Sequence, residues 1–168
     1  MNDTPRDPLA DLESSLGYVF KDFEILKRAL RHGSAVASDF AGTYQRLEFL
    51  GDAVLGHAVA LMLFERFPKD DQGDLTRKRV HLVRSERLAE QAALLGLDGW
   101  VEVGSSLERS GGREAASLLE DVFEAVIGAI AIDGGWDEAR AFIERQLGDE
   151  ADTLDERTLA LANPKSVL

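Results

Sequence analysis

Four carboxylates stand as two closely spaced pairs in the most hydrophobic parts of this 168-residue sequence. Glu48 and Asp52 are four residues apart, and Asp121 and Glu124 are three residues apart. In an α-helix, either spacing places both side chains of a pair on one face. Burying ionised carboxylates is costly unless cations lie between them, and Mg²⁺ prefers such oxygen ligands. The two pairs therefore predict a site for divalent metal ions.

Divalent ions held by carboxylates could activate a water molecule and neutralise charge on a phosphoryl group, which is the chemistry of metal-dependent nucleases. Small residues beside the pairs, among them Gly51 and Gly128, would allow two helix backbones to approach closely enough to share ions. Carboxylates with this spacing also line ordinary solvated helix faces. The spacing alone leaves both interpretations open.

The apolar pattern predicts an all-α fold, because alternating apolar and polar runs of strand length are nearly absent. The first carboxylate pair lies in a long helix predicted over about 44–67, which must end before Pro68. The second pair lies in an apolar helix predicted over about 117–132 and opened by a capping-box pattern of Ser117 and Glu120. Shorter helices are predicted at 9–16, 23–30, 75–84, 86–95 and 137–147, with Ser85 capping the one at 86–95.

The net charge of −12, from 31 acidic and 19 basic residues, argues against a nucleic-acid partner when it is taken alone. Its distribution is uneven, since residues 76–87 contain five Lys or Arg and one Glu. This basic run is a candidate RNA-binding surface, although it could also be an ordinary solvated helix face. Its candidate RNA contacts are Arg77, Lys78, Arg79 and Arg84.

Residues 148–157 carry five acids against one Arg. We therefore assign residues 1–148 to one folded domain and residues 149–168 to an acidic tail and linker. The absence of cysteine limits metal ligands to oxygen and imidazole, and it fits a reducing compartment. The N-terminal residues lack the basic and apolar regions of a signal peptide, and no run reaches about 18 uninterrupted apolar residues, so we expect a cytoplasmic protein.

Two sequence blocks that contain the carboxylate pairs resemble the ribonuclease III family. Residues 44–55, YQRLEFLGDAVL, are similar to the family's signature, and residues 118–135, LLEDVFEAVIGAIAIDGG, are similar to its second block. Residues 16–34 resemble the family's N-terminal helices, and residues 72–90 resemble the helix pair that follows the signature. The resemblance covers about residues 9–147 in unbroken order.

This resemblance implies a helical endonuclease domain that forms a homodimer and cuts double-stranded RNA with Mg²⁺, for which Mn²⁺ can substitute. It implies products with 5′-phosphate and 3′-hydroxyl ends, and roles in rRNA and mRNA processing. By the family's pattern, the metal ligands are Glu48, Asp52, Asp121 and Glu124, of which Asp52 and Glu124 are catalytic. Phe49 matches the residue that family dimers insert into a pocket of the partner subunit, whereas burial arguments alone would assign it to the core.

The sequence also departs from the family. Gln45 and Gln72 stand where many relatives carry Glu, which leaves substrate preference and metal number open. Bacterial members continue into a double-stranded-RNA-binding domain, toward which residues 149–168 would lead and which this sequence lacks. One alternative is a binding or scaffold relative without catalysis, although the intact carboxylates argue against it. Another is a phosphohydrolase for small nucleotides, which would need a closed pocket rather than an open groove for duplex RNA.

Overall fold

The computed structural model describes residues 9–36 and 40–155, and these residues are almost entirely helical. The helices are α1 Leu9–Leu16, α2 Phe23–Ala29, α3 Gln45–Arg66, α4 Gln72–Val83, α5 Ser85–Leu94, α6 Ser105–Arg109, α7 Ala116–Gly134 and α8 Trp136–Asp152. Within the described ranges, extended pairing is limited to one isolated bridge between Arg31 and Glu102. The prediction of an all-α fold is confirmed.

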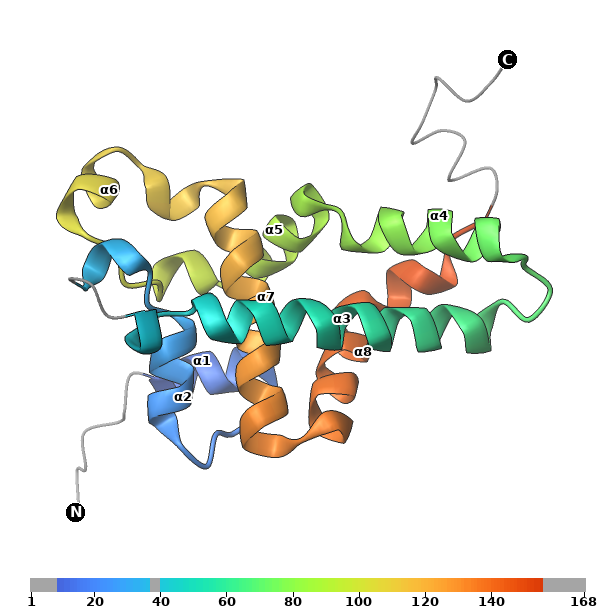
Figure 1. The fold of residues 1–168 in the computed structure, drawn as a ribbon, viewed down its shortest axis with the longest axis horizontal. Coiled ribbons are helices and arrows are strands. Elements are labelled where there is room, and N and C mark those ends of the chain that lie inside the picture. Colours follow the sequence, from blue (N-terminus) through green and yellow to red (C-terminus); the bar gives the residue numbers. More distant parts are fainter. Residues whose placement is uncertain (1–8, 37–39, 156–168) are drawn as a thin grey trace.

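Helix α7 forms the centre of the molecule, because every residue from Val122 to Ile130 is buried. It packs most extensively against α3 and next against α5, and α3 runs across it along the length of the molecule (Figure 1). Helix α3 has the length and hydropathy of a membrane span by composition alone. Seven of its residues are buried against the rest of the fold, so packing around a central helix accounts for its apolar character.

The C-terminal end of α7 is tied to the N-terminal part of the chain by Asp133. Its carboxylate accepts hydrogen bonds from the Tyr18 hydroxyl at 2.6 Å and from the backbone amides of Lys21 at 2.8 Å and Asp22 at 3.0 Å. Gly135 then adopts φ of 91°, a conformation that favours glycine, and allows the chain to turn into α8. These contacts fix the far end of the central helix.

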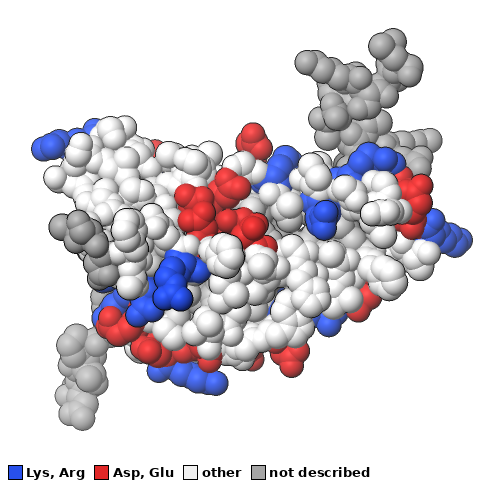
Figure 2. Space-filling view, in the orientation of Figure 1, with Lys and Arg blue, Asp and Glu red and all other residues white. Residues whose placement is uncertain are grey.

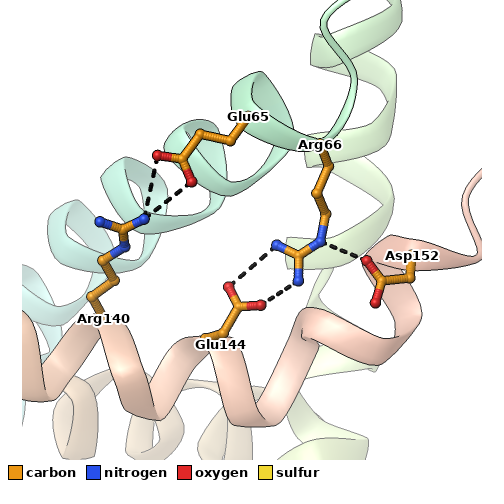
Figure 3. A network of polar contacts seen from close by, with 5 residues as sticks. All are labelled: Glu65, Arg66, Arg140, Glu144 and Asp152. Atoms are coloured by element: carbon orange, nitrogen blue, oxygen red, sulfur yellow. Dashed lines mark hydrogen bonds and ion pairs between the residues drawn. The ribbon is translucent and has the colours of Figure 1, made fainter.

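Ion pairs join the C-terminal half of α3 to α8 (Figure 3). The Arg66 guanidinium lies between Glu144 and Asp152, and its Nε is 2.6 Å from Asp152 Oδ1. Arg140 Nη2 lies 3.1 Å from Glu65 Oε2. Each pair is partly exposed, so we expect each to contribute little alone and to act mainly by holding the two helices in register.

Helix α8 extends beyond the predicted end at residue 147, so the predicted domain boundary at 148 is wrong. Ala151 is fully buried and Leu154 is 2% exposed, and both belong to the core. Of the acidic residues that suggested a solvated tail, Asp149 and Asp152 are exposed on α8, whereas Glu150 faces α4 and α5 and pairs with His81 and Arg87. The predicted linker at 156–168 lies outside the described residues.

Two predicted helix caps are also wrong. Helix α5 begins at Ser85 itself, with Arg84 in the extended conformation of an N-cap. Helix α7 begins at Ala116 with Ala115 as its N-cap, so Ser117 lies inside the first turn and forms no cap. The Ser85 hydroxyl instead donates a hydrogen bond to the carboxylate of Glu120. Ser85 and Glu120 therefore link α5 to α7 rather than capping their own helices.

Candidate metal centre

The candidate site lies where α3 crosses α7 at a pair of glycines. A Cβ atom on Gly51 would lie 1.7 Å from the carbonyl oxygen of Glu124, and one on Gly128 would lie 2.1 Å from the carbonyl oxygen of Leu47. No side chain fits between the helices at these two positions. The prediction that small residues allow a close approach is therefore confirmed for Gly51 and Gly128.

This crossing brings three of the four predicted carboxylates together. Ligand oxygens of Glu48, Asp121 and Glu124 all lie within 4.8 Å of one another. Glu124 is 9% exposed, while Glu48 and Asp121 are partly exposed. Figure 2 shows acidic side chains gathered near this crossing, at the centre of one face of the molecule. The cluster therefore has a buried floor and an opening to solvent.

Burial and mutual repulsion make the charged forms of these carboxyls unfavourable. Burial is the largest cause that raises the pKa of Glu124 to about 8, followed by the charge of Asp52. Burial also raises the pKa of Glu48 to about 7, followed by the charge of Asp121 and a hydrogen bond with it. Near neutral pH, the cluster thus holds protons unless a cation replaces them.

The fourth predicted ligand, Asp52, lies beside the cluster rather than in it. Its side chain is exposed, and it does not belong to the group of converging oxygens found among the described residues. Its charge still contributes to the raised pKa of both Glu124 and Glu48. Asp52 therefore stands close to the ligand cluster, on its solvent side.

Tyr44 was not predicted as a site residue, but it orients one of the carboxylates. It is buried immediately before α3, and its hydroxyl donates a hydrogen bond to Asp121 Oδ2 at 3.2 Å. Its backbone amide is held by the carbonyl of Arg31 at 3.0 Å. Burial and the charges of Asp121 and Glu48 raise the pKa of Tyr44 well above its usual range, so the hydroxyl stays protonated and remains a donor.

The donor set fits a hard divalent cation. Oxygen ligands and partial exposure suit Mg²⁺, which keeps several of its waters when it binds to proteins. A cation among Glu48, Asp121 and Glu124 would also relieve the repulsion that raises the pKa values of two of these carboxyls. The geometry therefore favours a metal centre over an ordinary solvated helix face.

The comparisons with known proteins agree with this geometry. A family model described as Ribonuclease-III-like matches residues 22–150. Ribonuclease 3 of Azorhizobium caulinodans is 42% identical over 161 residues, which are 95% of this chain and 67% of that protein. The chain belongs to the ribonuclease III family. It spans roughly 60% of the length of the curated family members that it matches.

Solved structures of ribonuclease III nuclease domains have the same fold. The nuclease domain from Campylobacter jejuni superposes with a TM-score of 0.81 at 38% identity, covering 89% of this chain and 99% of that one. A second structure of the same domain was described for flexibility in a region involved in its dimer formation. It gives a TM-score of 0.78 at 40% identity, covering 83% of this chain and 99% of that one. Most of the chain therefore has the fold of a family nuclease domain.

One of the four residues predicted to contact RNA is not available for it. Lys78 is 5% exposed, its ammonium group pairs with Asp70, and Nζ lies 3.4 Å from the centre of the Phe67 ring. The prediction for Lys78 is wrong, because this residue points inward from α4 and closes the turn between α3 and α4. A count of charges along the sequence does not show which basic residues of α4 face the protein interior and which face solvent.

The other three basic residues are exposed. Arg77 pairs with Asp74 one turn earlier on α4, and Arg84 donates a hydrogen bond to the carbonyl of His81 at 2.5 Å. Arg79 lines a groove of about 390 Å³ between α3 and α4. The predicted RNA contacts at Arg77, Arg79 and Arg84 remain compatible with the structure.

Phe49, predicted from the family resemblance to lie in a dimer interface, is 82% exposed on α3. A phenylalanine ring exposed to water is unfavourable by about 2 kcal/mol relative to a buried ring. Phe64 is also exposed, at 69%, about four turns further along α3. The outer face of α3 is therefore an apolar surface that another protein surface could cover.

Proposed function

We propose that this domain hydrolyses phosphodiester bonds of double-stranded RNA at a carboxylate metal site and works as a homodimer. The observation that carries the proposal is the convergence of Glu48, Asp121 and Glu124 at the α3–α7 crossing of a ribonuclease III family fold. The expected products carry 5′-phosphate and 3′-hydroxyl ends. Processing of rRNA and mRNA in the cytoplasm would be the biological setting.

In this proposal, Glu48, Asp121 and Glu124 bind the divalent ion, and Tyr44 keeps Asp121 oriented toward it. A bound Mg²⁺ or Mn²⁺ ion would supply water activation and charge neutralisation at the phosphoryl group. Asp52, exposed at the solvent side, can complete the metal site or accept a proton there. Asp52 and Glu124 would thus be the catalytic pair within the four ligands.

Duplex RNA is favoured as the substrate because the acidic cluster opens onto a broad face of the molecule (Figure 2). Basic side chains border this face, so an extended polyanion could contact them while one phosphate lies at the cluster. The groove between α3 and α4 has none of the four carboxylates in its lining. A small nucleotide held in that groove would not reach the metal site.

The exposed face of α3 supports the dimer part of the proposal. Phe49 and Phe64 are 15 residues apart, about 22 Å along the helix, and their midpoint lies between Gly56 and His57. If two α3 helices crossed antiparallel about a two-fold axis at this midpoint, each Phe49 would lie opposite the other copy's Phe64. Phe64 lines the groove between α3 and α4, which could receive the partner's Phe49 ring.

The decisive experiment is a gel assay with a perfect RNA duplex and a matched single strand, each with and without Mg²⁺. We expect cleavage of the duplex alone and only with the ion. Glu124→Gln should abolish cleavage while the fold persists, because the amide keeps the shape of the side chain and removes its charge. Glu138→Gln, a change of equal charge at the start of α8, should cleave like the wild type. Cleavage by Glu124→Gln at the wild-type rate would refute the metal-ligand assignment.

A further inference from the structure

A fifth carboxylate, Glu120, stands beside the candidate metal centre. It lies on α7 one turn before Glu124 and next to Asp121 in the sequence. Residues four apart on a helix share a face, so the Glu120 and Glu124 side chains leave α7 in similar directions. Its oxygens are not among those of Glu48, Asp121 and Glu124 that converge within 4.8 Å. Glu120 is thus near the cluster without being part of it.

The side chain of Glu120 is held from a second helix. The hydroxyl of Ser85, the first residue of α5, donates a hydrogen bond to Glu120 Oε2. Helices α5 and α7 pack extensively against each other, so this hydrogen bond joins two well-packed helices. A hydroxyl orients a carboxylate without cancelling its charge, whereas an Arg or Lys partner would neutralise it.

The charge of Glu120 reaches two of the proposed ligands. It contributes to the raised pKa of Glu124, after burial and Asp52 and ahead of Glu48 and Asp121. It also contributes to the raised pKa of Glu48, ahead of Asp52. A negative charge beside these ligand carboxylates, on the same face of α7 as Glu124, would attract a divalent cation bound between them.

We propose that Glu120, oriented by Ser85, is a positioning residue that strengthens divalent-cation binding through its charge while staying outside the converging ligand group. The inference rests on the metal centre proposed above. Replacement of outer residues around metal ligands typically lowers metal affinity about 10- to 100-fold. That range applies to residues that hydrogen-bond the ligands, whereas Glu120 would act through its charge, so we expect an effect at the lower end of the range.

Isothermal titration of the metal-free protein with Mg²⁺ at pH 9 tests the proposal directly. This pH lies above the raised pKa values of Glu48 and Glu124, so proton release does not mask a change in cation affinity. Glu120→Gln keeps an acceptor for Ser85 and removes the charge, and it should weaken binding about 10-fold. Ser85→Ala should weaken binding by a smaller factor, and it should have no further effect in the Glu120→Gln background.

Glu138→Gln is the matched control, because it removes the same charge beyond the far end of α7. It should bind Mg²⁺ like the wild type, and circular dichroism should show the same helical fold for every variant. Wild-type affinity in Glu120→Gln would overturn the inference and leave the metal centre intact if Glu124→Gln still loses binding. A wild-type protein that binds no Mg²⁺ would overturn the metal centre and this inference together.

Discussion

Glu124 combines burial with proximity to several like charges, and this combination defines its chemistry. A carboxyl in this position is stable when it is protonated or when a cation lies beside it, and unstable when it is charged and alone. Glu48 shares the same environment at the other side of the cluster. The protonation of these two residues therefore links the folding stability of the metal-free protein to pH.

The metal-free protein should lose stability as the pH rises from about 5 to 9. Both pKa values are raised on folding, to about 7 for Glu48 and about 8 for Glu124, so the unfolded chain releases these protons first. The two protonated carboxyls stabilise the fold fully below their pKa in the unfolded chain. This stabilisation is lost as the pH rises through their pKa values in the folded protein. Urea unfolding in the presence of a chelator measures this, and Glu124→Gln should flatten the decline. An equally steep decline in Glu124→Gln would contradict the assignment.

The four carboxylates could be predicted from the sequence as a candidate site because their spacing and their apolar surroundings are both visible there, and the family resemblance then favoured metal binding over a solvated helix face. Tyr44 and Glu120 were not found as parts of the site, because their importance depends on contacts with Asp121 and Ser85 that are distant in the sequence. Lys78 was misassigned for a related reason. Which way a basic residue faces on a polar helix depends on neighbours such as Asp70 and Phe67.

Among the helices, the crossing of α3 and α7 is the feature on which the site depends. Glu48 precedes Gly51 by one turn on α3, and Glu124 precedes Gly128 by one turn on α7. The glycines bring the two backbones together, and the ligands project from the turns that precede the contact. The spacing of the ligands is therefore set by the distance between two helices.

Gly51→Ala should destabilise the protein and impair Mg²⁺ binding. The added methyl group would overlap the carbonyl of Glu124, which belongs to the backbone and cannot move away without separating α3 from α7. We expect a loss of about 2–3 kcal/mol or more in the free energy of unfolding, measured by urea titration. Gly99→Ala is the control, since a Cβ there has no neighbour within 4 Å. Equal stability of the two variants would show that the crossing tolerates expansion.

Long helices were predictable, whereas their ends and the short helices were not. The two apolar segments around the carboxylates were placed within about two residues of α3 and α7. The five-residue α6 was not predicted, because it is too short for a periodic pattern to reveal. The end of α8 was misplaced because acidic residues dominate the sequence there, although Ala151 on α8 and Leu154 just after it are buried.

At the scale of the molecule, the exposed face of α3 and the distribution of charge affect which other molecules this protein can bind. A net charge of −12 repels RNA at long range, so binding must come from local basic groups and bound cations. The apolar outer face of α3 needs a different partner, and a second copy of the chain satisfies the two-fold arrangement described above.

Phe49→Ala should weaken the dimer by about 3 kcal/mol, because it removes an aromatic ring from the partner's groove. Sedimentation velocity over a range of micromolar concentrations would detect the shift toward monomer. Leu94→Ala removes an equally exposed apolar side chain from α5 and should leave the association unchanged. A wild-type protein that is monomeric at these concentrations would refute the proposed interface.

RNA binding should be weak and should decrease steeply between about 50 and 200 mM salt, as phosphate contacts require. Changing both Arg77 and Arg79 to Ala should weaken binding and reduce the salt dependence, measured by filter binding to a duplex. Lys78→Met removes a charge that the structure places inside the protein, so it should leave the salt dependence unchanged. Tight binding that is insensitive to salt would place RNA recognition elsewhere.

The last turn of α8 determines how far the chain can be shortened from its C-terminal side. Cutting after residue 148 would remove Leu154 from the core and would leave Arg87 and Arg66 without their partners Glu150 and Asp152. Cutting after residue 155 would retain Glu150, Asp152 and Leu154. A second domain joined to this one would therefore be attached beyond residue 155, and proteases should spare the preceding turn of helix.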